Sequence, residues 1–182
     1  TSATSLTFDR YYKSADFTHL AVKVEGASKE SDIADVVLGM DRLDFDFDST
    51  LHALVLRRGM LAQLREGTYT ITVDLASGKQ ETIELKVKDS APSGVTAYVA
   101  EYDTYAPTEP SFSLPLDRLA VRNVTAQKDG AELKAEMDYI LGAHTLTLTK
   151  KALEKYRLSN DHTEFTVTMS DNSVYTLVID YI

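Results

Sequence analysis

The chain has 182 residues, contains no cysteine or tryptophan, and carries a formal net charge of −9 with an isoelectric point near 4.9. This charge disfavours binding to nucleic acid or to an anionic membrane surface, since both attract clustered Lys and Arg. The absence of cysteine excludes disulfides, thiolate metal sites and cysteine nucleophiles, and no apolar run approaches the ~18 residues that a membrane-spanning helix requires.

Alternating apolar and polar residues predict short β-strands through the first half of the chain. The predicted strands cover residues 5–9, 17–24, 33–38, 43–47 and 51–56. One or two helical turns follow at residues 57–64, where Met60, Leu61 and Leu64 have helical spacing. A hairpin of residues 69–75 and 82–87 then encloses the turn signal Ala76-Ser-Gly-Lys.

Residues 88–116 form the predicted joint, because this stretch holds all four prolines of the chain: Pro92, Pro107, Pro110 and Pro115. Proline is excluded from central strands and stiffens connectors. Residues 95–102 have strand character, so we expect them to form the first strand of a second module or a strand docked at the junction. The joint is therefore predicted to be semi-rigid.

The second half of the chain repeats the order of the first. A strand begins near Leu119, a turn is predicted at Asp129-Gly130, and residues 136–141 and 144–149 form a hairpin. Ala152, Leu153 and Tyr156 mark a short helix, and residues 165–169 and 174–182 form a closing hairpin. Short strands at regular spacing with turn signals between them predict a β-sandwich or a barrel.

One stretch occurs twice, as residues 44–64 and again as residues 138–156. Each copy opens with an Asp–aromatic pair, turns, continues as an alternating strand and ends in a helical turn. With a constant offset, His52 falls on His144 and Leu61 on Leu153. A repeat with a period near half of the length predicts two modules, which we place at residues 1–89 and 90–182.

These motifs resemble the X2 modules of clostridial cellulosome scaffoldins. In the second module the resemblance rests on Lys128-Asp-Gly-Ala-Glu-Leu, Asp138-Tyr-Ile-Leu-Gly-Ala-His-Thr-Leu-Thr-Leu and Lys150-Lys-Ala-Leu. In the first it rests on Leu6-Thr-Phe-Asp, Asp44-Phe-Asp-Phe and Gly67-Thr-Tyr-Thr-Ile-Thr-Val. The Phe112-Ser-Leu-Pro opening of the second module is also similar to the family-46 carbohydrate-binding modules that follow an X2-like module in many family-5 glucanases.

The resemblance implies an all-β fold class with two tandem immunoglobulin-like β-sandwiches, each with one short helical turn. It also implies non-catalytic accessory modules of a secreted bacterial polysaccharide-degrading enzyme or cellulosomal scaffold. Its expected partners are plant cell-wall polysaccharide, such as β-glucan or xyloglucan, or a neighbouring catalytic domain of the same chain.

Tyrosines are the candidate carbohydrate-binding residues, because an aromatic ring stacks on the C–H face of a pyranose and its hydroxyl can bond sugar hydroxyls. Three of the ten tyrosines, Tyr98, Tyr102 and Tyr105, lie in the joint, and Tyr11 and Tyr12 form a second candidate pair. The alternative is that the rings in the joint pack where the modules meet.

Asp44, Asp46 and Asp48 alternate along a predicted strand, so they share one face with a spacing of about 6.5–7 Å. Three such carboxylates could hold Ca²⁺ if loops supplied carbonyl oxygens. The alternative, which the bare spacing favours, is a solvated outer face that keeps the sheet soluble. The triplet lacks the Gly and Glu of an EF-hand loop, and we expect no cofactor.

No catalytic motif is present: the sequence lacks Gly-x-Ser-x-Gly, a glycine-rich phosphate loop and His-Glu-x-x-His. His52 and His144 lie in separate modules, and 28 acidic residues produce chance pairs of carboxylates. We therefore expect a non-enzymatic, monomeric pair of modules that is secreted or attached to the cell surface. The chain begins with Thr1 rather than Met, and we take it as a fragment of a longer protein.

A second hypothesis remains open at this point. The chain could be a spacer or adhesion module of a bacterial surface protein that binds protein partners. The absence of tryptophan favours a spacer, whereas the tyrosines of the joint favour a carbohydrate binder.

Overall fold

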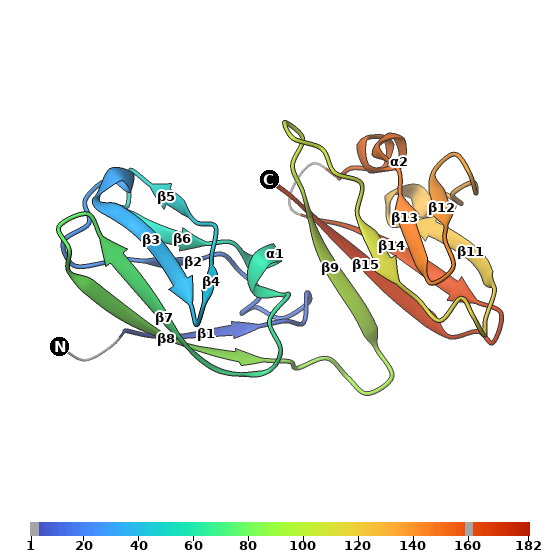
Figure 1. Ribbon diagram of the computed structural model, residues 1–182. Coiled ribbons are helices and arrows are strands. Elements are labelled where there is room, and N and C mark those ends of the chain that lie inside the picture. Colours follow the sequence, from blue (N-terminus) through green and yellow to red (C-terminus); the bar gives the residue numbers. More distant parts are fainter. Residues whose placement is uncertain (1–3, 159–161) are drawn as a thin grey trace. The chain divides into compact units, whose positions relative to one another are not determined.

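The structure is a computed structural model that describes residues 4–158 and 162–182 (Figure 1). The chain divides into two compact units, Thr1–Ala91 and Pro92–Ile182. Each unit is an all-β, immunoglobulin-like sandwich with one short α-helix among its described residues, which confirms the predicted fold class. None of the helices within the described ranges is long and apolar enough to span a membrane.

The first unit consists of a five-stranded sheet and a three-stranded sheet. The larger sheet has the order β1-β8-β7-β3-β4 and the smaller one β2-β6-β5. The elements are β1 (Thr4–Asp9), β2 (Leu20–Val22), β3 (Ile33–Leu38), β4 (Asp41–Arg42), β5 (Asp46–Asp48), β6 (Ala53–Leu56), α1 (Arg58–Leu61), β7 (Gly67–Leu75) and β8 (Gln80–Lys88), with a 3-10 turn at Glu30–Asp32.

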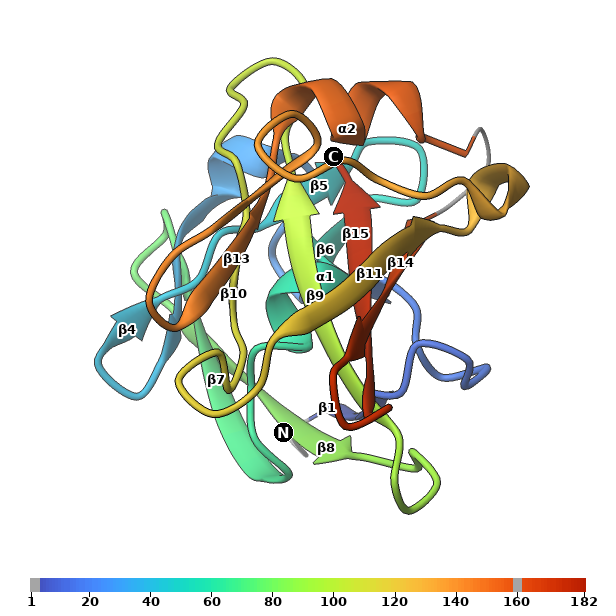
Figure 2. The ribbon, with the colours of Figure 1, turned by 90° about the vertical axis from the view of Figure 1, so that its right-hand side faces the viewer.

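The second unit has a four-stranded sheet of order β11-β14-β15-β9 and a three-stranded sheet of order β10-β13-β12. Its elements are β9 (Thr96–Tyr102), β10 (Ser111–Ser113), β11 (Val121–Ala126), β12 (Tyr139–Leu141), β13 (Thr145–Leu148), α2 (Lys150–Lys155), β14 (His162–Met169) and β15 (Val174–Tyr181), with a 3-10 turn at Lys128–Gly130. Figure 2 shows β9 and β15 running side by side in the same direction, with α2 near the ends of both.

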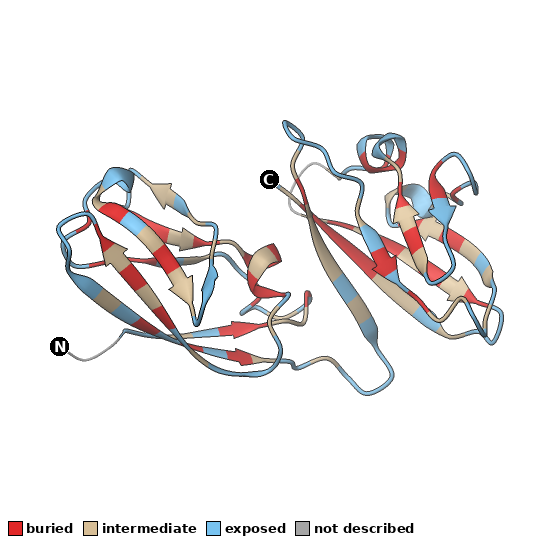
Figure 3. Ribbon diagram, in the orientation of Figure 1, coloured by how far each residue is buried: buried red, intermediate tan, exposed pale blue. Residues whose placement is uncertain are grey.

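Burial alternates along the strands because every second side chain of a strand points to the same face (Figure 3). Along β7, Ile71, Val73 and Leu75 are buried, and the residues between them are half-buried. On β14, Phe165 and Val167 are fully buried in the same manner. The alternating sequence pattern thus assigns one face of each sheet to the core of its own unit.

The internal repeat of the sequence is also a repeat of structure. In the first unit, β1 is an edge strand that pairs in parallel with the last strand, β8. In the second, β9 is the edge strand and pairs in parallel with the last strand, β15. The strand β6 followed by α1 corresponds likewise to β13 followed by α2. The predicted strand at residues 95–102 is therefore the opening strand of the second sandwich.

Some predicted strands are shorter than expected. The strand expected over residues 17–24 is limited to β2, because Phe17 is buried in the preceding loop, where its ring lies 5.8 Å from that of Phe8. The strand expected from Leu119 begins at Val121, where the pairing with β14 is interrupted by a register shift. In both places tertiary packing, and not the alternating sequence pattern, decides where the strand begins.

Candidate functional site

Tyr98 lies on β9 and pairs in register with Leu177 of β15, a fully buried residue. Tyr175 precedes Leu177 by two positions, so both tyrosines project from the same face of the sheet. Their ring centroids are 6.3 Å apart and the planes are nearly parallel, at 5°. Tyr98 is 36% exposed. Burial, followed by the neighbouring Tyr175, raises the pKa of the Tyr98 hydroxyl, so Tyr98 stays neutral to a higher pH than a free tyrosine.

Parallel pairing of Thr96 with Tyr175 places the starts of β9 and β15 next to each other. Val95, just before β9, and Val174, the first residue of β15, are exposed hydrophobic residues there. Val174 is next to Tyr175 on the strand, so its side chain points to the opposite face of the sheet. We call the pair Tyr98 and Tyr175 the tyrosine platform.

Tyr102 has a different environment. Only 1% of its surface is exposed, and it belongs to the core of the second unit. Its ring meets that of Tyr181 edge to face, with centroids 5.8 Å apart. Burial, together with the charges of Glu154 and Glu109, raises the pKa of the Tyr102 hydroxyl. A ring enclosed in this way has no face open to a sugar, so Tyr102 is a core residue in this structure.

Tyr105 is the most exposed of the candidate tyrosines, at 96%. It follows the end of β9, where its backbone N–H donates to the carboxylate of Asp103 at 2.8 Å. Four residues of strand separate Tyr98 from Tyr102 by about 13 Å, and Tyr105 lies beyond that end. The structure thus does not gather the three tyrosines of the joint into one surface.

Tyr11 and Tyr12 lie in the loop between β1 and β2 of the first unit. Their rings pack edge to face at 5.4 Å, Tyr12 is buried and Tyr11 is half-buried. The ammonium group of Lys13 lies 5.6 Å from the centre of the Tyr12 ring. This second candidate pair for carbohydrate binding is therefore largely committed to packing within the first unit.

Each carboxylate of the aspartate triplet is engaged within the first unit. The Arg57 guanidinium lies 3.2 Å from the Asp46 carboxylate and 3.8 Å from that of Asp44. The Asp48 carboxylate accepts the backbone N–H groups of Thr50 and Leu51, at 2.8 and 2.9 Å. Across residues 4–158 and 162–182, no group of three His, Asp or Glu side chains is arranged to hold a metal ion.

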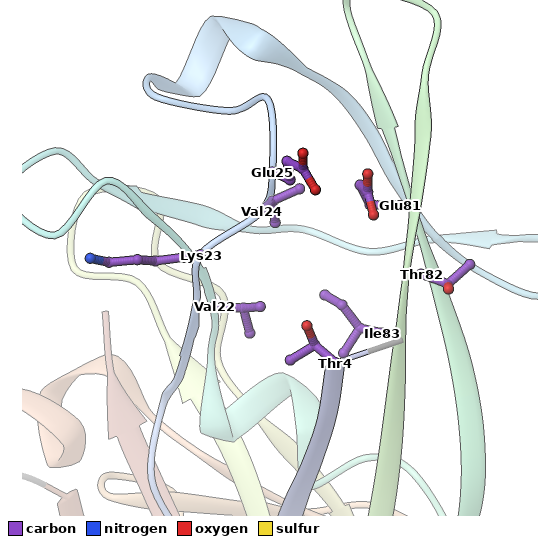
Figure 4. Close-up of a pocket in the computed structure, with 8 residues that line it drawn as sticks. All are labelled: Thr4, Val22, Lys23, Val24, Glu25, Glu81, Thr82 and Ile83. Atoms are coloured by element: carbon purple, nitrogen blue, oxygen red, sulfur yellow. The ribbon is translucent and has the colours of Figure 1, made fainter. Parts of the chain in front are cut away.

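A cavity of about 120 Å³, which the sequence pattern does not predict, opens in the first unit (Figure 4). Val22, Val24 and Ile83 line it with apolar groups, and the carboxylates of Glu25 and Glu81 stand on the same side of it. The side chain of Lys23 points away from it. Typical ligand pockets are about 300–1,000 Å³, so this cavity is too small to enclose an oligosaccharide.

Sequence reasoning overlooked Tyr175, which becomes a candidate only through the pairing of β15 with β9. Its position in a closing hairpin predicts a strand but not which strand lies beside it. The parallel pairing of the first and last strands joins residues far apart in sequence, and a periodicity pattern carries no information about that pairing.

No protein-family model matches the chain, and no curated protein sequence matches it. Solved structures of similar architecture include a tri-modular GH5 (subfamily 4) endo-β-1,4-glucanase from Bacillus licheniformis complexed with cellotetraose. It is 12% identical over 98% of this chain and 37% of that chain, with a TM-score of 0.37. The tri-modular endo-β-1,4-glucanase B from Bacillus halodurans is 10% identical over 95% of this chain and 33% of that chain, with a TM-score of 0.36.

A third structure is SGBP-B from the mixed-linkage glucan utilization locus of Bacteroides ovatus, in complex with a mixed-linkage heptasaccharide. It is 14% identical over 97% of this chain and 42% of that chain, with a TM-score of 0.29. The chain thus spans well under half of the length of each of these three proteins. The likeness is one of fold, and it is limited to a part of longer proteins.

Proposed function

We propose that the chain is a non-catalytic accessory part of a secreted bacterial polysaccharide-degrading protein, and that its second unit binds a β-glucan chain at the tyrosine platform. The observation that carries the proposal is the parallel alignment of Tyr98 and Tyr175, with Tyr98 open to solvent. The motifs that resemble X2 and family-46 modules support the same reading of both units.

The chemistry of the platform suits a neutral sugar chain. The C–H face of a pyranose is apolar and stacks on an aromatic ring, while a tyrosine hydroxyl can bond the hydroxyl groups at the sugar edge. Contact between Tyr98 and Tyr175 holds both rings in place, which reduces the entropy that a ligand must remove on binding.

Affinity electrophoresis in gels containing barley β-glucan or xyloglucan tests the proposal. We expect the full chain to be retarded, and Tyr98→Ala to lose most of that retardation. Met40→Ala is the matched control, because Met40 is a fully exposed apolar residue at the β3–β4 turn of the first unit. The proposal fails if the wild-type chain migrates equally in gels with and without glucan.

One surface favours the second hypothesis, a spacer or adhesion module that binds protein. Met137, Ile140 and Leu141 are exposed hydrophobic residues on and beside β12, the edge strand of its sheet. Exposed apolar side chains at a sheet edge are typical of protein-binding surfaces. If Ile140→Lys abolishes binding to cells that lack β-glucan while Tyr98→Ala has no effect, the second hypothesis is favoured.

A further inference from the structure

A basic surface surrounds α2 in a unit that is otherwise acidic. Six of the eight Lys and Arg residues of the second unit lie within positions 128–157: Lys128, Lys134, Lys150, Lys151, Lys155 and Arg157. The Lys128 ammonium donates to the backbone carbonyl of Lys155 at 3.3 Å, which brings the Lys128–Gly130 turn to the C-terminal end of α2. Residues far apart in sequence therefore contribute to one charged surface.

Two of these cations are held against aromatic rings. The Arg157 guanidinium lies 4.4 Å from the centre of the Tyr181 ring, and the Lys155 ammonium lies 5.0 Å from that of Tyr156. Tyr181 is itself fixed, since its hydroxyl donates to the carbonyl of Leu153 at 2.7 Å. A guanidinium stacked on a ring keeps its N–H edge free for a carboxylate.

Ion pairs with the described carboxylates neutralise only a small part of this positive charge. Lys150 lies 3.7 Å from the Glu154 carboxylate, one helical turn away. For Lys151, Lys155 and Arg157, the structure shows no ion pair with any carboxylate of residues 4–158 and 162–182, and all three are exposed. Lys151 and Lys155 are four residues apart and share one side of α2.

An exposed aromatic ring belongs to the same end of the unit. Tyr105 lies in the loop between β9 and β10, which Figure 2 shows beside the start of α2. The loop is tied to the helix because the backbone N–H of Lys150 donates to the Glu109 carboxylate at 3.0 Å. Tyr105, which is 96% exposed, thus belongs to a loop at the end of the unit that carries α2.

The helix dipole explains only part of this arrangement. Cations near a helix C-terminus are stabilised, which accounts for Lys128 and Lys155. It does not account for Lys151 near the start of α2, or for the exposed ring of Tyr105. Duplex DNA fits poorly, because its dense phosphates would also face the acidic remainder of a chain with a net charge of −9.

We propose that Lys151, Lys155, Arg157 and Tyr105 form a binding site for a carboxylated polysaccharide, a polyuronate. Such a chain carries one carboxylate per sugar and an apolar sugar face, so it matches spaced cations beside an open ring. This site differs from the tyrosine platform in its position, its residues and the charge of its ligand. It does not depend on the proposed β-glucan binding.

Isothermal titration calorimetry of the full chain with polygalacturonate at low ionic strength tests the proposal. We expect binding that weakens as salt is added, and at least a tenfold loss of affinity in Lys151→Gln/Lys155→Gln/Arg157→Gln. The control, Lys23→Gln/Lys79→Gln/Lys86→Gln, removes the same charge from exposed positions of the first unit and is expected to bind as the wild type does. Circular dichroism checks that both triple variants are folded.

Three further measurements decide the class of ligand. Tyr105→Ala is expected to reduce the affinity for polygalacturonate severalfold while the chain stays folded, because the ring has no internal packing role. Fully methyl-esterified polygalacturonate, which lacks the charge, is expected not to bind. The proposal is overturned if the two triple variants lose affinity equally, if the esterified polymer binds as well, or if duplex DNA of equal charge concentration binds more tightly.

Discussion

Tyr102 and Tyr181 meet edge to face at an interplanar angle of 80°, where the parallel strands β9 and β15 end together. The Tyr102 hydroxyl is buried there and has no hydrogen-bond partner among the residues that the structure describes. A buried polar group without a partner costs stability that an apolar group of the same shape does not. The contact therefore combines favourable packing of the rings with an unfavourable hydroxyl.

We predict that Tyr102→Phe stabilises the second unit by about 1 kcal/mol, because it removes the unpaired hydroxyl and keeps the ring. Tyr102→Ala is expected to destabilise the unit by about 3–5 kcal/mol through the cavity that it leaves. Differential scanning calorimetry of the full chain measures both changes. A lower melting temperature for Tyr102→Phe would show that the hydroxyl is hydrogen-bonded.

The capping of α2 gives a second prediction. The Thr149 hydroxyl accepts the backbone N–H of Ala152 at 3.3 Å and donates to the carbonyl of Met137 at 2.9 Å. We expect Thr149→Ala to destabilise the unit by about 1 kcal/mol, and Thr149→Ser to retain most of the stability. Equal losses in the two variants, measured by urea unfolding, would assign the effect to the lost methyl group instead.

Asp9 gives a prediction about acid stability. Its buried carboxylate accepts the backbone N–H groups of Tyr11 and Ser90, at 3.0 and 3.1 Å. Burial on its own raises the pKa of this carboxyl, but hydrogen bonds from Ser90 and Tyr11 outweigh it, so the pKa lies below its ordinary value of 3.8. The ionised form is favoured by folding, so its contribution is present above the unfolded-state pKa and is lost as the pH falls through the folded-state pKa.

Asp9→Asn is therefore expected to destabilise the first unit by about 1–2 kcal/mol at neutral pH. The free energies of unfolding of the variant and the wild type should become equal once the pH is below the folded-state pKa of Asp9. Urea unfolding across this pH range checks the prediction, with the exposed Asp41→Asn as the control. A difference between Asp9→Asn and the wild type that is independent of pH would contradict the role of the charge.

The tyrosine platform predicts a difference between two substitutions at one position. If the Tyr98 ring stacks on the sugar face, Tyr98→Phe keeps β-glucan affinity within about twofold, whereas Tyr98→Ala lowers it by at least about tenfold. Titration calorimetry with a soluble cello-oligosaccharide measures both. Equal losses of affinity in Tyr98→Phe and Tyr98→Ala would mean that the hydroxyl, and not the ring, makes the decisive contact.

The aspartate triplet gives a prediction about metal. Since Arg57 lies beside Asp46 and Asp44, and Asp48 is used in the turn before β6, adding Ca²⁺ or EDTA should leave the melting temperature unchanged. Asp48→Ala should lower it, because two backbone N–H groups lose their acceptor. A rise of the melting temperature with Ca²⁺ that Asp46→Asn abolishes would instead support a calcium site.

The sequence alone determined the class of fold, because this information is local. Alternating residues such as Ile71, Val73 and Leu75 place one face of a strand in a core whatever its neighbours are. The repeat that aligns His52 with His144 shows that one structural unit is used twice. The short helices were predicted for the same reason, since their spacing is read within one or two turns.

The tertiary structure alone decided which candidate residues can meet a ligand. Tyr98, Tyr102 and Tyr105 are close in sequence, but strand geometry assigns them to a half-open platform, a core and an exposed loop. The parallel pairing of β9 with β15 brings Tyr175 to Tyr98, and a bond from Lys128 to the Lys155 carbonyl joins two segments of a basic surface. Such pairings depend on long-range packing, which the local periodicity of a sequence does not encode.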